Sequence, residues 1–503
     1  VFTGADDNGD AIGAIAGDTD NDGDLDLYVL NFDQPNVLYR NMWIEDGAVP
    51  ANPLRFVDIT RATDPTPLTA DGQFGVAFAI DNQILLDNSL SAAFADVDRD
   101  GDLDLYVGNH NGWYIGFVPP FSMLEGPDPR PGRRDIFYRN DGGNVFTEVT
   151  MTMPGTQLTG FETATGAQTT TDQRFSSTNA LIFGDFNGDR WPELFITNKI
   201  GVPQSPTQPD PDADMMYLNG GGASPATWTG FQADTYNISA TFGRISPAAM
   251  GVDVGDVDND GDLDIYIADI AGVANVLYRN TTPPGGALAF TADTSLPGVF
   301  NWGTKFLDVD NNGTQDIYVG SNNGSADLLY HQPTLGTFNE IGVAAGVGQT
   351  GDTRGVMTAD YNRDGWQDVF IINRLGNPIL YENTSATAFP NRRWLYVELV
   401  GNPAGPGPFQ SSVDAIGARV FVSADLNGNS VIDVGEIQNL EVRSGSSNAA
   451  STSSLILEFG VGQATTADVF VLWPSGATHV FLANATNQCL QIDEATASIL
   501  GPC

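Results

Sequence analysis

The sequence predicts an all-β protein: a β-propeller of six or seven blades over residues 1–388, followed by a small β-sandwich over residues 389–503. Three observations predict this fold. One acidic phrase recurs six times in the first part of the chain. Each copy is followed by short runs rich in Val, Ile, Tyr and Phe, which favour strands. The tail lacks the phrase but keeps strand-like runs.

The acidic phrase has the pattern Asp-x-Asp/Asn-x-Asp/Asn-Gly-x-x-Asp/Glu, and only the third copy departs from it at position 6. That copy has Arg190 where the others have Gly, with Gly188 two places earlier. Successive copies start 78, 89, 71, 52 and 52 residues apart. A period near 50 residues with four strands per unit is typical of propeller blades. The copies begin at Asp18, Asp96, Asp185, Asp256, Asp308 and Asp360.

Each copy has the same surroundings. A Gly- and Ala-rich run precedes it, a run such as DLYVLN follows, then one such as NVLYRN, and often a fourth such as VFTEVT. No long segment has the 3.6-residue period of a helix. Six copies predict six blades, and a degenerate seventh within residues 61–95 or 150–178 stays open. Residues 1–3, VFT, resemble the fourth run and are expected to complete the last blade and close the ring.

The composition changes near residue 390, where the repeats stop. Six or so strand-like runs follow: WLYVELV, ARVFVSA, IQNLEVR, SLILEFG, ADVFVLWP and THVFLA. Short strands at this density predict a β-sandwich. Cys489 and Cys503 are expected to form a disulfide, two free thiols being the alternative. Such low cysteine use with one local pair favours an oxidising, extracytoplasmic location.

Charge and hydropathy disfavour nucleic-acid-binding and membrane proteins. Lys and Arg number 21 against 63 Asp and Glu, a net charge of −42, while 41% of residues are hydrophobic, enough for folded cores. This charge argues against binding nucleic acid or anionic membranes. The sequence has no run of 18 apolar residues, so no transmembrane helix is expected. Because the numbering starts at Val1, we expect a mature, secreted or cell-surface chain whose signal peptide has been removed.

The acidic phrases predict calcium sites. Ca²⁺ takes six to eight oxygen ligands, and side chains at positions 1, 3, 5 and 9 of a tight turn, with the carbonyl of position 7, could converge on one point. Gly at position 6 permits the bend. So many carboxylates repel one another unless a cation intervenes, solvated acidic turns being the alternative. The absence of His and Cys from the phrases disfavours transition metals, and Mg²⁺ prefers a smaller octahedral site.

Six calcium ions are therefore expected, one per phrase. The predicted side-chain ligands are Asp18, Asp20, Asp22 and Asp26; Asp96, Asp98, Asp100 and Asp104; Asp185, Asn187, Asp189 and Glu193; Asp256, Asp258, Asp260 and Asp264; Asp308, Asp310, Asn312 and Asp316; and Asp360, Asn362, Asp364 and Asp368. The predicted carbonyl ligands are those of Asp24, Asp102, Trp191, Asp262, Thr314 and Trp366. Each ion is expected to stabilise the turn between the first two strands of a blade.

A seventh candidate lies in the tail, at residues 425–436. It follows the spacing of a twelve-residue calcium loop, with Ser430 in place of the expected Gly. A polar hairpin tip without metal is the alternative. The candidate ligands are Asp425, Asn427, Asn429, the carbonyl of Val431, Asp433 and Glu436.

The repeats resemble the FG-GAP/VCBS repeats of integrin-α-like propellers, in phrases such as DVDNDGDLDIYIAD and NVLYRN. The tail resembles the ASPIC/UnbV domain at residues 416–420, 444–446, 459–462 and 473–476. This pairing is similar to that of cartilage-acidic-protein-like extracellular proteins. The resemblance implies a secreted calcium-binding propeller with a β-rich cap. It also implies seven blades, against the six that the phrases predict.

No catalytic site is expected. The three histidines are His110, His331 and His479, and a Ser475/His479 hydrolase pair lacks the GxSxG elbow. We expect an extracellular adhesion or structural protein that binds a protein, a glycan or copies of itself. A self-assembling filament or layer subunit and an uncharacterised extracellular enzyme are the alternatives. The Pro-rich inserts 119–134 and 202–214 are candidate contact surfaces, and Asn237, Asn280, Asn312, Asn323, Asn383 and Asn484 lie in glycosylation sequons.

Overall fold

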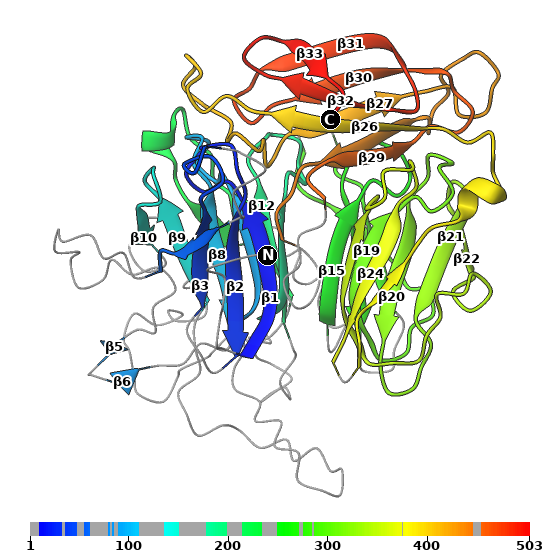
Figure 1. Ribbon diagram of the computed structural model, residues 1–503, viewed down its shortest axis with the longest axis horizontal. Helices are drawn as coiled ribbons and strands as arrows, with labels where there is room; N and C mark the ends of the chain where they lie inside the picture. The colour runs from blue at the N-terminus through cyan, green and yellow to red at the C-terminus, as the bar shows by residue number, and fades with distance from the viewer. Residues whose placement is uncertain are drawn as a thin grey trace, which may run out of the picture.

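The computed structural model confirms an all-β protein (Figure 1). It describes residues 10–32, 36–47, 55–60, 79–80, 83–84, 89–109, 135–149, 178–198, 214–233, 249–270, 275–283, 286–374, 376–445 and 454–503. The expectations for residues 1–3, both Pro-rich inserts, His110, Asn237 and most of the segments considered for a seventh blade lie outside these residues. Within them, no helix is long and apolar enough to span a membrane.

Six antiparallel sheets follow one another along the repeat region, and each acidic phrase belongs to one of them. Five sheets have four strands and the sixth has three among the described residues. The first three sheets are β1 (Asp10–Gly17), β2 (Asp26–Phe32), β3 (Val37–Asn41) and β4 (Phe56–Asp58); β7 (Ser89–Ala95), β8 (Asp104–Asn109), β9 (Ile136–Asn140) and β10 (Phe146–Glu148); and β11 (Thr178–Gly184), β12 (Glu193–Asn198), β13 (Met215–Asn219) and β14 (Phe231–Ala233).

The other three sheets repeat this order. They are β15 (Ala249–Gly255), β16 (Asp264–Asp269), β17 (Val276–Asn280) and β18 (Phe290–Asp293); β19 (Asn301–Leu307), β20 (Asp316–Ser321), β21 (Leu328–Thr334) and β22 (Thr337–Glu340); and β23 (Thr353–Ala359), β24 (Asp368–Asn373) and β25 (Ile379–Tyr381). A two-stranded ribbon, β5 (Ala79–Ile80) and β6 (Gln83–Ile84), and two short 3₁₀ turns, η2 (Pro225–Thr227) and η3 (Ser385–Thr387), complete the repeat region.

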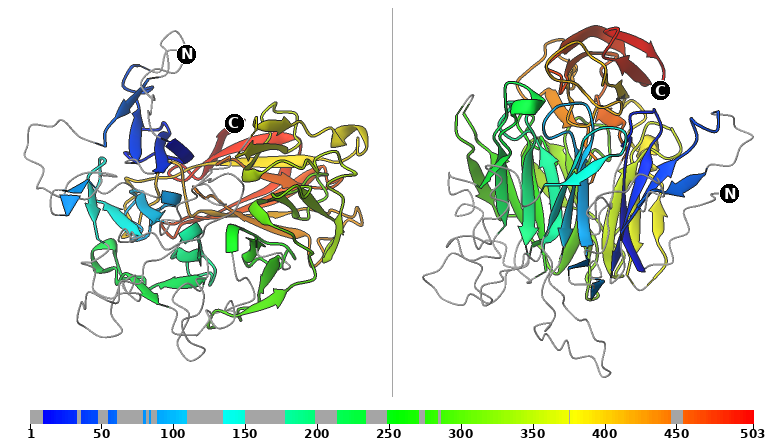
Figure 2. Two further views of the ribbon diagram at one scale, coloured as in Figure 1. Left: turned by 90° about the horizontal axis from the view of Figure 1, so that it is seen from below. Right: turned by 90° about the vertical axis from the view of Figure 1, so that its left-hand side faces the viewer.

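The sheets stack face to face like blades, as Figure 2 shows from below. Successive first strands contact one another in the order β1, β7, β11, β15, β19 and β23. Apolar side chains fill the space between neighbouring sheets, for example Ile182, Phe195 and Ile265 between the third and fourth. Among the described residues no comparably extensive contact joins β23 to β1, so closure of the propeller and the choice between six and seven blades stay predictions.

The C-terminal part forms two further four-stranded sheets, β29-β26-β32-β33 and β28-β27-β30-β31. Their strands are β26 (Trp394–Val400), β27 (Arg419–Ser423), β28 (Ile437–Glu441), β29 (Leu457–Gly460), β30 (Thr466–Leu472), β31 (Thr478–Ala485), β32 (Gln488–Asp493) and β33 (Ser498–Gly501). Val397, Val422 and Val469 belong to one shared core, as a sandwich requires. The first six match the predicted runs, whereas β32 and β33 were missed.

The C-terminal sheets lie across one end of the blade sheets (Figure 1). The last described blade strand ends at Tyr381 and β26 begins at Trp394, on either side of the predicted boundary at 388/389. A disulfide joins Cys489 of β32 to Cys503, as predicted.

Candidate metal centres

Each acidic phrase forms the tight turn between the first two strands of a sheet. Position 1 follows the last residue of the first strand, and position 9 begins the second strand. In the first two sheets, for example, the pairs Gly17–Asp26 and Ala95–Asp104 close the hairpins. This register places all six turns at the end of the sheets that faces the C-terminal domain.

The backbone of the turn has the same two left-handed residues in all six copies. Position 4 has a positive φ, at Asn21, Arg99, Gly188, Asn259, Asn311 and Arg363, and so has position 6. Glycine adopts this conformation without steric cost, which explains the Gly of the phrase. Arg190 adopts it at φ 72° in the third copy, where a side chain costs about 1 kcal/mol.

Backbone hydrogen bonds fix the carboxylates at positions 1 and 9. In the second turn, the two oxygens of Asp96 accept the N–H groups of Asp100 and Gly101, each at 3.0 Å. Asp104 accepts the N–H of Val97 at 3.1 Å and that of Asn140 on β9 at 2.9 Å. The other turns repeat most of these bonds, so a short sequence holds several carboxylates at defined positions.

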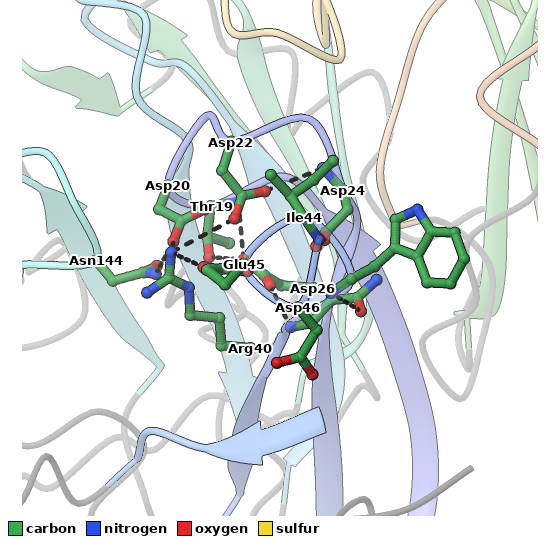
Figure 3. Close-up of polar contacts among 12 residues, drawn as sticks. Thr19, Asp20, Asp22, Asp24, Asp26, Arg40, Ile44, Glu45, Asp46 and Asn144 are labelled. Carbon is green, nitrogen blue, oxygen red and sulfur yellow. Dashed lines mark hydrogen bonds and ion pairs between the residues drawn. The ribbon is translucent and has the colours of Figure 1, made fainter. Parts of the chain in front are cut away.

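The carboxylates converge in four of the turns. In each group, one ligand atom from each of three residues lies within 4.8 Å of the others. Figure 3 shows the first turn, where Asp20 and Asp22 point toward Arg40. The groups among the described residues are Asp18, Asp20 and Asp22; Asp22, Asp24 and Glu45; Asp96, Asp98 and Asp104; Asp256, Asp258 and Asp260; and Asp310, Asp316 and His331.

Burial raises the pKa of these carboxyl groups and so favours their protonated form. In the first turn, burial followed by the charge of Asp414 raises the pKa of Asp18 to about 8. Burial raises the pKa of Asp26 and Asp98 to about 7. It also raises the pKa of Asp256 well above its usual value, and the charge of Asp264 adds to the effect. A bound cation would reverse this preference for the protonated form.

Position 3 gives the clearest indication that a cation fits. One oxygen, Oδ1, of Asp20, Asp98, Asp258 and Asp310 is buried and has no hydrogen-bond partner. Asp98 and Asp310 are only 4% and 3% exposed. A buried oxygen without a partner is costly, and the surrounding donors are all oxygens apart from His331. The donor set therefore fits a hard divalent cation such as Ca²⁺.

The turns are not equally acidic. Asp185, Asp189 and Glu193 in the third turn and Asp360, Asp364 and Asp368 in the sixth lie in the same backbone positions but form no group of three converging carboxylates among the described residues. Asn187 donates to Glu193 at 3.0 Å and Asn362 donates to Asp364 at 3.1 Å. The amide at position 3 thus bonds a neighbouring carboxylate in these two turns.

The tail candidate, residues 425–436, has the same turn with positive φ at Gly428 and Ser430. The two oxygens of Asp425 accept N–H groups of the loop, as position 1 does in the blades. Asn427, Asn429 and Asp433 are exposed, however, whereas Glu436 is buried. Asp433 accepts hydrogen bonds from Asn427 at 3.1 Å and Asn429 at 2.6 Å. Calcium binding here stays a prediction.

The sequence reasoning missed the residue that covers three of the loops from the third strand. Arg40 lies 2.5 Å from Asp20, Arg279 lies 3.0 Å from Asp258, and His331 lies 3.3 Å from Asp310. His331 thus faces the fifth loop. The signal was present, because all three precede the last Asn or Gln of the NVLYRN-type run.

The Asn or Gln that ends the NVLYRN-type run links neighbouring blades. Its side-chain amide donates to the carbonyl of position 2 in the preceding blade's turn, at 2.8–3.1 Å. The five pairs are Asn140 with Thr19, Asn219 with Val97, Asn280 with Phe186, Gln332 with Val257 and Asn383 with Val309. The six acidic turns are therefore connected, each to the next, along the repeat region.

Ser475 and His479 each form a hydrogen bond with another residue of the C-terminal domain. The hydroxyl of Ser475 donates to Glu494, and Nδ1 of His479 accepts the indole N–H of Trp473 at 3.1 Å. Both residues therefore have structural partners within the C-terminal sheets.

Comparisons with known proteins agree with the repeats and the tail. The chain matches the FG-GAP-like repeat family over residues 185–267, 256–319 and 308–371, and the ASPIC and UnbV family over residues 407–499. No curated protein matches the chain in sequence.

Solved structures share only a distant likeness. A lectin of Agrocybe aegerita, described as recognising non-reducing terminal N-acetylglucosamine, is 15% identical with a TM-score of 0.39, covering 75% of this chain and 81% of its own. The rhamnogalacturonan lyase YesW is 12% identical with a TM-score of 0.28, covering 75% and 72%. The V. cholerae biofilm matrix protein Bap1 is 12% identical with a TM-score of 0.23, covering 79% and 59%. From its sequence matches, the chain is an FG-GAP-like repeat protein with a C-terminal ASPIC and UnbV domain.

Proposed function

We propose that this protein is a secreted calcium-binding propeller that acts as an extracellular interaction or structural protein, with calcium rigidifying its blades. One observation carries the proposal. The same buried position-3 oxygen lacks a partner in four turns. Position 3 is directed to the same place by the same backbone in each of them, as expected for a repeated ligand.

Calcium suits the site better than other cations. The carboxylate and carbonyl donors are those that Ca²⁺ and Mg²⁺ prefer. Mg²⁺ demands near-ideal octahedral geometry and keeps much of its water, which favours the larger ion in crowded turns. Repeated sites of modest affinity would fill at the millimolar calcium of extracellular fluids. The disulfide agrees with such a location.

The proposed role is mechanical and not catalytic. An ion in each turn would hold the first two strands of a blade together, and the third-strand amides would link that turn to its neighbour. A rigid scaffold of this kind presents its loops to a protein, a glycan or another copy of the chain. An activity survey on polysaccharides is expected to show no turnover.

Calcium titration and thermal unfolding test the proposal. We expect calorimetric titration of the EGTA-treated chain with calcium to show binding at several sites, and titration with Mg²⁺ to show weaker binding. A site at 100 times its Kd adds about 2.7 kcal/mol. Several sites should therefore raise the Tm by more than about 10 °C.

Matched variants locate the effect. Asp98→Asn should weaken the calcium-dependent rise in Tm, because it removes charge from the buried position-3 oxygen. Asp468→Asn is the control, since Asp468 lies on β30 and its carboxylate, within the described part of the chain, accepts only the exposed N–H of Ala483 at 2.7 Å. Equal Tm values in calcium and in EGTA would defeat the proposal.

A further inference from the structure

The C-terminal domain contacts all six acidic turns between the first two strands of the blades. Some contacts come from its backbone: the N–H groups of Val413, Gln410 and Gly462 donate to Asn21, Arg99 and Asn311 at 2.9–3.0 Å. Others run the opposite way: Arg190 and Asn259 donate to the carbonyls of Gly476 and Gly435. The sixth turn donates the N–H of Asp360 to Glu458. The domain therefore depends on the shape and charge of every turn.

Three of these contacts share one chemistry. A carboxylate of the C-terminal domain accepts the backbone N–H of position 1, the residue that begins an acidic turn. Asp414 accepts from Asp18 at 3.0 Å, Glu441 from Asp185 at 3.1 Å and Glu458 from Asp360 at 3.1 Å. The domain thus places three carboxyl groups, whose pKa values burial raises, directly on turns that are themselves rich in carboxylates.

This arrangement is electrostatically unfavourable without cations. Glu441 and Glu458 are only 4% and 8% exposed, so water screens their charge poorly. Arg419 offsets part of the charge at the third turn, where its guanidinium lies 3.3 Å from Asp185. Arg443 adds positive charge near Glu441. Among the described residues, no basic side chain forms an ion pair with Asp18, Asp414, Asp360 or Glu458.

We propose that calcium binding by the turns and seating of the C-terminal domain are coupled, with Asp414 as the coupling residue at the first turn and Glu441 and Glu458 adding to the coupling at the less acidic third and sixth turns. A divalent ion converts each turn from an anionic to a less anionic or neutral surface, to which the carboxylates of the domain are attracted. By reciprocity, a seated domain raises the calcium affinity of the turns. This inference rests on the proposed function.

Amide substitutions separate charge from hydrogen bonding. In the variant Asp414→Asn, Glu441→Gln and Glu458→Gln, each side chain keeps an oxygen that can accept the same N–H while the charge is lost. The control removes three carboxylates of the same domain that bond only within it: Glu398→Gln, Asp468→Asn and Asp493→Asn.

Hydrogen exchange of three backbone amides measures seating. The N–H groups of Gln410, Val413 and Gly462 belong to the C-terminal domain, but their acceptors lie in the second, first and fifth turns. In the full chain and the control, we expect EGTA to accelerate their exchange about tenfold or more relative to 5 mM CaCl₂, within the usual range of coupling. In the amide variant, we expect this acceleration to be at least about fivefold smaller.

The outcomes distinguish this inference from the proposed function. Calcium binding without any change in exchange of the three amides would overturn the coupling and leave the proposed function standing. No calcium binding at all would overturn the proposed function. An amide variant that responds to EGTA like the control would show that these carboxylates do not couple the two events. Small-angle scattering should show the matching expansion of the wild-type chain in EGTA, and unchanged circular dichroism confirms that the variants fold.

Discussion

The amide of Asn280 should be one of the most important side chains for cohesion between blades. Asn280 is 2% exposed at the end of β17. Its Nδ2 donates to the carbonyl of Phe186 in the preceding blade at 2.8 Å and to that of Leu263 in its own turn at 3.3 Å. Its Oδ1 accepts the N–H of Thr282 at 3.1 Å. Its burial also makes it a poor glycosylation site, although its sequon is intact.

Replacing Asn280 by Ala leaves these buried groups without partners. Each unsatisfied buried group costs about 1–3 kcal/mol, so we expect Asn280→Ala to lower the free energy of unfolding by about 3–5 kcal/mol. Asn41 provides a matched control. It occupies the same place in the first sheet, but among the described residues its Nδ2 donates only to the carbonyl of Leu25, at 3.2 Å. Leu25 is 40% exposed, so Asn41→Ala should cost about 1 kcal/mol.

Urea unfolding in saturating calcium, followed by tryptophan fluorescence, measures both variants. Comparable m-values are needed for the comparison of midpoints to report stability. The difference of about 2 kcal/mol or more between the variants estimates the inter-blade hydrogen bond. If Asn280→Ala is no more destabilising than Asn41→Ala, the inferred network between the turns is wrong.

Three further predictions concern the turns and the disulfide. In EGTA, the Tm should fall as the pH rises from about 4 to about 8. Burial raises the folded-state pKa of Asp18 to about 8 and of Asp26 to about 7, so in this range the folded chain binds more protons than the unfolded chain and loses stability as the pH rises. A flat or rising Tm would contradict this. Arg190→Ala should be about 1 kcal/mol less stable than Arg190→Gly in urea unfolding, because Ala keeps the strain of a positive φ at this position; equal stabilities would show that the turn relaxes. Replacing Cys489 and Cys503, which are 14 residues apart, by Ser should lower the unfolding free energy of the C-terminal domain by about 3 kcal/mol, and a loss below about 1 kcal/mol would indicate that the loop is already ordered without the bond.

The sequence was sufficient for the local structure of the repeats. The spacing of the Asp residues and the Gly at position 6 predict a tight turn, and the strands beginning at Asp26, Asp104 and Asp264 lie where the runs of β-forming residues place them. The disulfide was predictable because only two cysteines exist and they are close in sequence.

The remaining features depend on contacts between distant segments. The pairing of Glu441 with Asp185 spans 256 residues, and that of Asp414 with Asp18 spans 396. No local pattern specifies which carboxylate of the tail meets which turn. His331 also looked ordinary in sequence, because its role follows from the register of β21 beside β20 and not from the residues next to it. Strand β32 escaped notice because its polar, mixed composition lacks a clear alternation, and β33 because a run of four residues is too short to stand out.

A crystal structure of the chain grown in calcium, with anomalous data collected on the same crystals, tests the central claim most directly. We expect an anomalous peak in each of the four turns that have a partnerless position-3 oxygen, within about 2.3–2.6 Å of that atom. Peaks confined to the surface, with the Oδ1 atoms of Asp20, Asp98, Asp258 and Asp310 bonded to water, would contradict the account.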